Sequence, residues 1–231
     1  MNFQGKKALV TGGSRGIGKA IAAALAARGA AVAVNGRDEA VLKKTAAELK
    51  AVPIQADVSR EEDCVRLVKT AIEELGGLDI LINNAGIGKG APLVEMTKEI
   101  LHQVMAINVL GAMLVGREAA RHFVAQESGA IVNISSTAGL KGMARGTAYC
   151  ASKFALRGMT ECWRDELRRH NIRVVLVNPS EVQTEWGGRT LDEINPRKLL
   201  PEDIAAAVIG ALEVNERGFV PELAVFATNP F

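Results

Sequence analysis

Short apolar runs rich in β-branched residues alternate along the chain with longer segments of helical periodicity. Runs that are apolar on both faces are typical of strands in a parallel sheet that helices cover on each side. We expect such strands at residues 8–10, 31–34, 52–54, 80–82, 130–132 and 174–177. Helices are expected between them, near residues 16–28, 38–50, 59–75, 99–126 and 149–169. The alternation predicts an α/β fold: a single doubly wound domain over residues 1–231, with a parallel sheet of about seven strands.

Two local signals mark the ends of the third helical segment. Ser59 stands three residues before Glu62, which is the spacing of a capping box. The pair Gly76-Gly77 follows the segment, and glycine readily takes the left-handed conformation that ends a helix. The sequence therefore predicts a helix that starts at Ser59 and stops at Gly76.

The composition excludes several classes of partner. Hydrophobic residues make up 48% and charged residues 23%, the net charge is +2, and no run of five like charges occurs. Neither nucleic acid nor an anionic membrane is therefore expected as a partner. No apolar stretch approaches the length of a membrane span. The densest basic patch lies at a predicted helix end, where it suits the helix dipole and is expected to be structural: Arg164, Arg168, Arg169 and His170.

The cysteines and histidines show no metal or disulfide pattern. Cys64, Cys150 and Cys162 are widely spaced and include no C-x-x-C pair, which fits a reducing, cytoplasmic location. The N-terminus leads into a strand without an apolar signal region, which supports the same location. No metal site is expected, because the three histidines lie far apart: His102, His122 and His170.

A glycine-rich segment joins the first expected strand to the first expected helix. Glycines here allow a tight turn and a close approach of the backbone to a pyrophosphate, while the helix N-terminus offers N–H groups. The spacing alone is weak evidence, but its place between a strand and a helix predicts a dinucleotide-binding loop. Its candidate binding residues are Gly12, Ser14, Arg15, Gly16, Ile17 and Gly18.

The end of the second strand bears on which dinucleotide binds. NAD-type sites place a carboxylate there to accept the ribose 2′-hydroxyl, but this chain has Gly36 and Arg37. Arg37, together with Arg15 and Ser14, can instead form a pocket for a 2′-phosphate, because guanidinium groups match phosphate oxygens. Alternatively, this segment only starts the second helix, with Asp38 as its cap, and Asp38 also has the reach to bind a ribose. The sequence favours NADP(H), with NAD(H) as the alternative.

Tyr149, the only tyrosine of the chain, stands four residues before Lys153. This spacing places both side chains on one face of a helix. The ordinary pKa of tyrosine is about 10, and a fixed cation nearby favours the phenolate and lowers that pKa toward the working range of a general acid. The pair therefore indicates proton transfer, although taken alone it also fits an ordinary i, i+4 pair on a helix surface.

Together these motifs resemble those of the short-chain dehydrogenase/reductase family over about residues 7–184. The resemblance implies a Rossmann fold and hydride transfer between a nicotinamide and a carbonyl or secondary alcohol. The motifs occur in the family's order: Thr11 to Gly18, Asp57-Val58, Asn83-Asn84-Ala85-Gly86, Asn108, Ser135-Ser136, Tyr149 with Lys153, and Asn178-Pro179.

The same resemblance implies a role for each matched residue. Tyr149 exchanges a proton with the substrate oxygen, and Ser136 donates a hydrogen bond to that oxygen, where negative charge develops. Lys153 holds the ribose hydroxyls and lowers the pKa of Tyr149, and Asn108 anchors a water of the proton relay. The other matched residues bind the cofactor: Asp57 and Val58 at the adenine, Asn84, Ala85 and Gly86 at the sheet end, Pro179 after the sixth strand, and Val182 and Thr184 at the carboxamide.

The chain departs from the family pattern after the sixth strand. Ser180 stands where the family usually has glycine, and serine tolerates fewer backbone conformations, so the loop is expected to take another path. Glu181 points either into the substrate region or into water. Residues 185–200 are expected to form a substrate lid. The C-terminal sequence resembles the branch that acts on small carbonyls and alcohols rather than the branch with a Gly-rich end.

These observations predict an NADP(H)-dependent oxidoreductase of a small carbonyl or alcohol. One alternative is a 3-oxoacyl-(acyl-carrier-protein) reductase, and an alternative of another class is a non-catalytic NADP(H)-sensing protein. A homodimer or homotetramer is expected, formed through the helices near residues 111–126 and 149–169. The second of these helices offers an apolar face, part of which must cover the sheet: Ala151, Phe154, Ala155, Gly158 and Cys162.

Overall fold

The computed structural model describes residues 1–184, 195 and 197–229 of the chain. At its centre is a parallel sheet in the order β3-β2-β1-β4-β5-β6-β7. All six strands expected from the sequence are present, and a seventh lies near the C-terminus. The strands are β1 (Lys7–Val10), β2 (Ala31–Gly36), β3 (Val52–Gln55), β4 (Ile80–Asn83), β5 (Gly129–Ile134), β6 (Ile172–Pro179) and β7 (Glu222–Val225).

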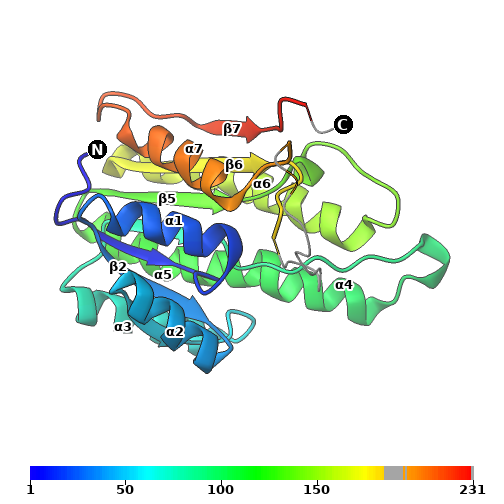
Figure 1. Ribbon diagram of the computed structural model, residues 1–231, viewed down its shortest axis with the longest axis horizontal. Coiled ribbons are helices and arrows are strands. Elements are labelled where there is room, and N and C mark those ends of the chain that lie inside the picture. Colours follow the sequence, from blue (N-terminus) through cyan, green and yellow to red (C-terminus); the bar gives the residue numbers. More distant parts are fainter. Residues whose placement is uncertain (185–194, 196, 230–231) are drawn as a thin grey trace.

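Helices cover both faces of the sheet, as Figure 1 shows. One face carries α1 (Gly16–Ala26), α2 (Glu39–Leu49) and α7 (Pro201–Glu213). The opposite face carries α3 (Glu61–Leu75), α5 (Ala112–Ala125) and α6 (Thr147–Leu167). The short helix α4 (Lys98–Met105) lies beyond the carboxyl ends of the strands. The predicted doubly wound architecture is therefore confirmed.

Two apolar layers explain why the strands have no polar side. Val10 and Val34 pack with α1 and α2 in one layer, whereas Leu9 and Leu81 pack with α3 and α5 in the other. Neighbouring residues of a strand point to opposite faces, so a sheet covered on both faces requires an unbroken apolar run.

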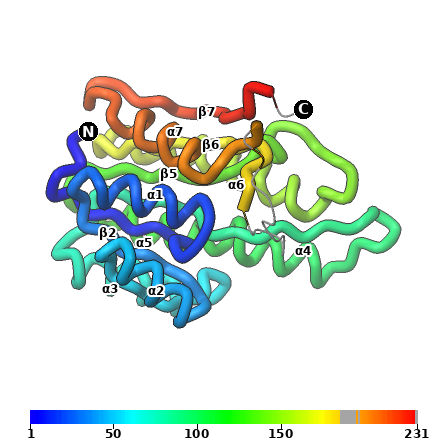
Figure 2. The backbone as a smooth tube through the Cα atoms, viewed as in Figure 1, coloured from blue at the N-terminus to red at the C-terminus, as the bar shows by residue number. Residues whose placement is uncertain are grey.

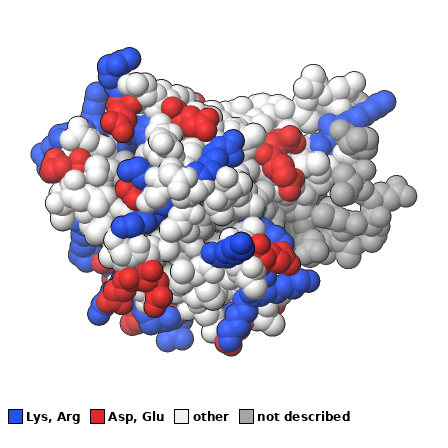
Figure 3. Space-filling view, turned by 60° about the vertical axis from the view of Figure 1, so that its left-hand side comes forward, with Lys and Arg blue, Asp and Glu red and all other residues white. Residues whose placement is uncertain are grey.

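The N-terminus is held against the end of α7, as Figure 2 shows. The Met1 ammonium group donates to the carbonyls of Leu212 and Glu213, at 3.1 Å each. These carbonyls belong to the last turn of the helix, where a cation complements the negative end of the dipole. Charges of both signs are interspersed over the face of the molecule shown in Figure 3.

The structure corrects the predicted start of the third helix. The N-cap of α3 is Arg60, and no side chain caps the helix. The Ser59 hydroxyl instead donates to Asp57 Oδ1 at 2.8 Å, so the capping box is wrong: a neighbouring carboxylate competes for the serine. The predicted end is confirmed, because Gly76 terminates the helix with a φ of +70°.

The long helix expected near residues 99–126 is interrupted. A π-helix over Ala106–Gly111 separates α4 from α5. By length and composition alone the run Lys98–Ala125 is apolar enough to cross a membrane, which corrects the expectation that no stretch approaches this length. This is weak evidence for a membrane span, because core helices pass the same test and α5 buries Val115 and Phe123 against the sheet.

The helix α7 is not among the elements expected from the sequence. Asp203 accepts a hydrogen bond from the N–H of Leu200 at 2.8 Å at the start of this helix, and Pro201 occupies its first position. Ile204 and Val208, four residues apart, are fully buried against the sheet. These start signals and the i, i+4 spacing are visible in the sequence.

Gly18→Ala is expected to lower the free energy of unfolding by about 1–3 kcal/mol. A Cβ at this position would lie 2.4 Å from Asn84 Nδ2 and from the carbonyl oxygen of Gly12. Urea denaturation measures the effect. Gly210→Ala in α7 is the control, because nothing lies within 4 Å of its Cβ, and alanine there should stabilise the helix by up to about 1 kcal/mol. Similar effects at the two positions would contradict the crowding at Gly18.

Candidate active site

The glycine-rich loop leaves the end of β1 and enters α1 at Gly16. Gly12 and Gly16 have φ angles of +61° and +51°, in the left-handed region that favours glycine. No side chain caps the start of α1, and its first turn contains no acidic residue. The N–H groups and the positive end of the dipole are therefore presented to an anion. This backbone cradle fits the pyrophosphate of a dinucleotide.

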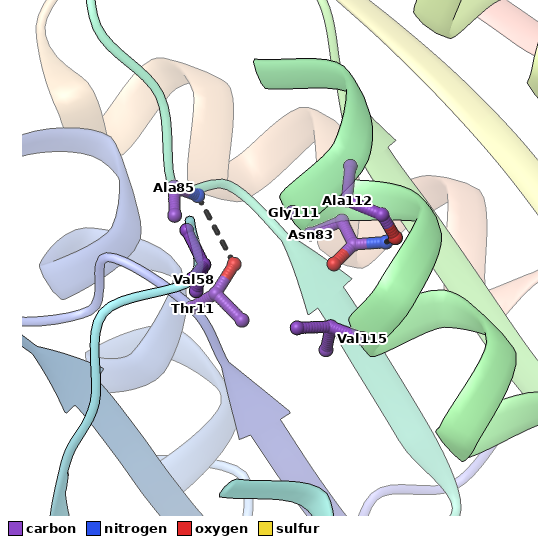
Figure 4. Close-up of a pocket in the computed structure, with 7 residues that line it drawn as sticks. All are labelled: Thr11, Val58, Asn83, Ala85, Gly111, Ala112 and Val115. Atoms are coloured by element: carbon purple, nitrogen blue, oxygen red, sulfur yellow. Dashed lines mark hydrogen bonds between the residues drawn. The ribbon is translucent and has the colours of Figure 1, made fainter. Parts of the chain in front are cut away.

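Hydrogen bonds tie this loop to the end of β4. Thr11 Oγ1 accepts from the N–H groups of Asn84 and Ala85, at 3.0 Å each, and the second of these bonds is drawn in Figure 4. Asn84 Nδ2 donates to the carbonyls of Thr11 and Gly12 at 3.0 and 3.2 Å. Thr11 and Ala85 also help to line the small space shown in Figure 4. Asn84 thus holds the cradle in shape.

The end of β2 carries the residues expected to distinguish the two dinucleotides. Asp38 accepts from the N–H of Val41 at 3.2 Å and so caps α2, as the alternative interpretation predicted. The same carboxylate pairs with Arg15 at 3.2 Å, so Arg15 is bound to Asp38 rather than grouped with Arg37. Gly36 allows Ser14 to lie close, because a Cβ there would be 2.9 Å from Ser14 Oγ.

Asn35 supports this region, and the sequence analysis did not assign it a role. It is buried in β2, and its Nδ2 donates to the carbonyls of Ile54 and Ala56 at 3.2 and 3.0 Å. Its Oδ1 accepts from the N–H of Gly12 at 3.4 Å. The signal in the sequence is a polar residue in an otherwise apolar strand, which needs internal hydrogen bonds.

Asp57 and Val58 follow β3, at the position predicted for the adenine end of the site. Asp57 Oδ1 accepts from the backbone N–H and the hydroxyl of Ser59, at 3.0 and 2.8 Å. The carbonyl of Val58 lies close to the end of the π-helix, since a Cβ at Gly111 would be 2.6 Å from it. Beside Asp57 lies a surface pocket of about 300 Å³, lined by Arg37, Gln55, Ala56, Asp57, Asp63 and Arg66.

Ser136 and Tyr149 are brought together by two different elements. Ser136 follows β5 and accepts from the N–H of Ala138 at 3.1 Å, while Tyr149 lies in the first turn of α6. Their side chains are hydrogen-bonded to each other. Burial raises the pKa of Tyr149, and the bond from Ser136 offsets this only in part. The predicted lowering of the Tyr149 pKa by Lys153 is therefore wrong for this structure, because desolvation is the largest influence.

Lys153 lies one turn after Tyr149 and is 5% exposed. Its ammonium group is 5.7 Å from the centre of the Tyr149 ring and donates to the carbonyl of Ile134 at 2.9 Å. Burial lowers the pKa of Lys153 to about 8. The i, i+4 pair is thus not an ordinary surface pair, because the lysine lies in the protein interior.

Asn108 lies in the π-helix and is 1% exposed. Its Nδ2 donates to the carbonyl of Ile87 at 2.9 Å and to Ser152 Oγ at 3.0 Å, and its Oδ1 accepts from the N–H of Ile87 at 2.8 Å. Ser152 Oγ in turn donates to the carbonyl of Tyr149 at 2.7 Å. Asn108 therefore joins the loop after β4 to the first turn of α6, and its water-anchoring role stays a prediction. π-helical turns occur frequently at functional sites.

The segment after β6 folds back over the glycine-rich loop. A Cβ at Gly16 would lie 3.3 Å from Thr184 Cγ2. Val182 forms a parallel bridge with Leu199, and the N–H of Ser180 donates to the carbonyl of Val225 at 2.9 Å. Most of the expected lid, residues 185–194 and 196, lies outside the described residues.

The remaining charged candidates have structural partners. Glu181 pairs with Lys198 at 3.2 Å and remains half-exposed. Arg164 donates to the carbonyls of Val174 and Pro221, at 3.2 and 2.7 Å, which confirms a structural role for this member of the basic patch. Within the described residues, no group of three His, Cys, Asp or Glu side chains is arranged to hold a metal ion.

Lys153 should make stability rise between pH 8 and pH 10. Its pKa is about 8 in the folded chain against an ordinary 10.5, so over this range the unfolded chain binds more protons. The full difference is on the order of 3 kcal/mol. Urea denaturation from pH 7.5 to 9.5 measures the rise, which Lys153→Met should flatten. Tyr149 and Cys64, whose pKa values are raised by burial, act oppositely above about pH 10 and pH 9 respectively, and both contributions are common to the two proteins. Parallel curves for the two proteins would show that Lys153 does not titrate here.

Comparisons with known proteins agree with this arrangement. The short chain dehydrogenase family model matches residues 6–194. The chain is 37% identical to carbonyl reductase family member 4 of Xenopus tropicalis, over 90% of this chain and 91% of the relative. A short chain dehydrogenase from Burkholderia cenocepacia in complex with NADP superimposes with a TM-score of 0.87, at 32% identity and 98% coverage of both chains. A 3-ketoacyl-(acyl-carrier-protein) reductase from Brucella melitensis complexed with NADH superimposes with a TM-score of 0.90, at 30% identity and 98% coverage of both chains. The chain therefore belongs to the short-chain dehydrogenase/reductase family of oxidoreductases.

Proposed function

We propose that this chain is an NADP(H)-dependent oxidoreductase that interconverts a carbonyl and a secondary alcohol on a small substrate. The observation that carries the proposal is the hydrogen-bonded pair of Ser136 and Tyr149, with the buried Lys153 one turn away. Two hydroxyl groups that meet at the carboxyl edge of the sheet, beside a dinucleotide cradle, are suited to bind one substrate oxygen.

The protonation state of Tyr149 suits the donation of a proton. Because burial raises its pKa above the ordinary value, the phenol keeps its proton at neutral pH and offers it to a substrate oxygen that gains negative charge. Ser136 orients this hydroxyl and offers a second hydrogen bond to the same oxygen. The nicotinamide, when bound, supplies the hydride chemistry. These features favour the reduction of a carbonyl.

The cofactor assignment rests on the end of β2. Gly36 leaves this position without a carboxylate, and Arg37 follows it with no side-chain partner among the described residues. An unpaired guanidinium is suited to a 2′-phosphate, and the Burkholderia relative was solved with NADP. NAD(H) remains the alternative cofactor, because Asp38 lies next in the chain and the Brucella reductase was solved with NADH.

The other parts of the proposal follow the same family pattern. Residues 1–231 form one nucleotide-binding unit, with residues 185–200 as its substrate lid. The three cysteines are free thiols in this structure, which supports a reducing compartment such as the cytosol. The second candidate activity is that of a 3-oxoacyl-(acyl-carrier-protein) reductase, which the similarity to the Brucella enzyme supports. A non-catalytic sensor is less well supported, because Ser136, Tyr149 and Lys153 are all in place.

Tyr149→Phe should reduce turnover by at least about 10²-fold, because it removes the proton donor and keeps the ring. The measurement is NADPH oxidation, with NADH in parallel, against small ketones, diketones, 3-oxo acids and a 3-oxoacyl thioester. NADPH affinity, measured by its fluorescence on binding, should change little. Unchanged turnover in the variant would overturn the mechanism, and tight NADPH binding without turnover by the wild type would favour the sensor.

We also propose that the chain forms a homodimer or homotetramer through α6. Ala151, Phe154, Gly158 and Cys162 lie exposed along one side of this helix. Phe154 is 46% exposed, and a Cβ at Gly158 would meet nothing within 4 Å. An apolar helix stripe of this kind is suited to close packing against a second copy.

Phe154→Asp should shift the assembly toward the monomer, because it places a charge in the middle of the proposed interface. Size-exclusion chromatography with light scattering at micromolar concentration measures the mass. Val65→Asp is the matched control, since Val65 is 40% exposed on a different helix, α3. A monomeric wild type would refute the oligomer, and an unchanged mass of the Phe154 variant would place the interface elsewhere.

A further inference from the structure

The pocket beside Asp57 lies where β2 and β3 end. Gly36 and Gln55 are register partners at the ends of these strands, and Arg37 is the next residue after Gly36. Arg37 and Arg66 both line this pocket of about 300 Å³. It adjoins the adenine end of the proposed site, at the edge of the sheet.

Gln55 holds the main chain of Arg37. Its Nε2 donates to the Arg37 carbonyl at 2.9 Å, whereas the Arg37 guanidinium has no partner among the described residues. A residue with a fixed backbone and an unpaired charged side chain is arranged to bind a ligand, because its position is set without using its hydrogen-bond donors.

Arg66 forms hydrogen bonds with two other residues that line the pocket. Its guanidinium donates to the carbonyl of Gln55 at 3.1 Å and to Asp63 Oδ1 at 2.8 Å. Asp63 Oδ2 accepts from the N–H of Asp57 at 2.8 Å, and this bond, followed by the one from Arg66, lowers the pKa of Asp63. Asp63 is therefore an anion that fixes Arg66 at the Asp57 side of the pocket. Gln55 connects the two arginines, because its carbonyl accepts from Arg66 and its side chain donates to the Arg37 carbonyl.

The charge pairing leaves Arg37 to bind an added phosphate. Arg15 is paired with Asp38 at 3.2 Å, and Arg66 with Asp63 at 2.8 Å. A 2′-phosphomonoester carries up to two negative charges and three oxygens, which a guanidinium binds in a geometry-dependent way. A small displacement of the Arg37 backbone should therefore weaken phosphate binding more than adenine binding.

We propose that Gln55 and Arg66 are positioning residues that set coenzyme selectivity: they fix the main chain at Arg37 and so present its guanidinium to the 2′-phosphate of NADP(H). The inference rests on the proposed function and deepens its cofactor assignment. It extends the selectivity site from the end of β2 to the edge strand β3 and to α3.

Calorimetric titration of the full-length chain with 2′,5′-ADP and with 5′-AMP tests this inference. The two probes differ only in the 2′-phosphate, so the ratio of their affinities isolates it. The wild type should prefer 2′,5′-ADP, and Arg37→Ala should remove that preference. Gln55→Ala and Arg66→Ala should each reduce it by roughly three- to tenfold, the equivalent of one or two hydrogen bonds, and leave 5′-AMP affinity unchanged.

Two further variants separate positioning from charge and from folding. Lys69→Ala removes a cation one turn further along α3, where Lys69 is exposed and faces Glu73 at 3.8 Å, and it should leave the ratio unchanged. Gln55→Met keeps the approximate size of the side chain and removes the donor without adding a charge, so it serves if Gln55→Ala does not fold. The Gln55 and Arg66 variants should raise the KM for NADPH more than that for NADH, whereas Lys69→Ala should leave both KM values unchanged.

The possible failures are distinguishable. Equal losses for both probes in the Gln55 and Arg66 variants would show a merely structural role and overturn the positioning inference, while the Arg37 assignment would stand. An unchanged ratio of the 2′,5′-ADP and 5′-AMP affinities in the Gln55 variants would also overturn the positioning inference. No preference for 2′,5′-ADP in the wild type, or none lost in Arg37→Ala, would overturn the cofactor assignment itself.

Discussion

The hydrogen bonds that join Thr11 to Asn84 and Ala85 hold the ends of β1 and β4 together where the strand order reverses. From β1 the chain builds the sheet outward to β3 and then returns to start the other half at β4. Loops that leave two such strands in opposite directions open a crevice at the carboxyl edge of the sheet. The bonds of Asn84 Nδ2 to the carbonyls of Thr11 and Gly12 fix the glycine-rich loop to the end of β4.

Buried asparagines extend this control to α6, the helix that carries Tyr149. Asn83 Nδ2 donates to Asn133 Oδ1 at 3.1 Å, and Asn133 Nδ2 donates to Thr160 Oγ1 of α6 at 2.8 Å. Asn108 holds the first turn of α6 through Ser152. Buried polar groups that satisfy one another fix the register of the elements that carry them, because any slip leaves a donor or acceptor unpaired. The helix that carries Tyr149 is thus held at two points. Thr160 bonds to the sheet, and Ser152 bonds to the π-helix.

Most of the architecture was predictable because strands buried on both faces leave an unbroken apolar run, as at Ile80-Leu81-Ile82. The place of the glycine-rich loop and of Ser136 was predictable for a different reason: both follow the carboxyl ends of parallel strands, which meet at one edge of the sheet. Details that depend on competing partners were not. Ser59 has the spacing of a cap but bonds to Asp57, and Arg15 bonds to Asp38. The support that Gln55 gives to Arg37 joins two strands through a side chain and a carbonyl, and such a contact leaves no periodic signal in a sequence.

The pKa of Tyr149 is raised, whereas the sequence predicted that it is lowered. The spacing of two residues along a helix indicates that they lie close together, but it does not indicate how far they are withdrawn from water. Four residues of separation place Lys153 beside Tyr149, but the ammonium group donates to Ile134, and both groups are withdrawn from water. Desolvation favours the neutral form of each group, so it raises the pKa of the phenol and lowers that of the amine. Among the described residues the buried ammonium group of Lys153 has one acceptor, the Ile134 carbonyl, for its three N–H donors. Burying a charged group with so few partners lowers the stability of the folded chain. Such a cost is typical of functional sites rather than of helix surfaces. In the proposed mechanism the tyrosine therefore starts as the proton donor.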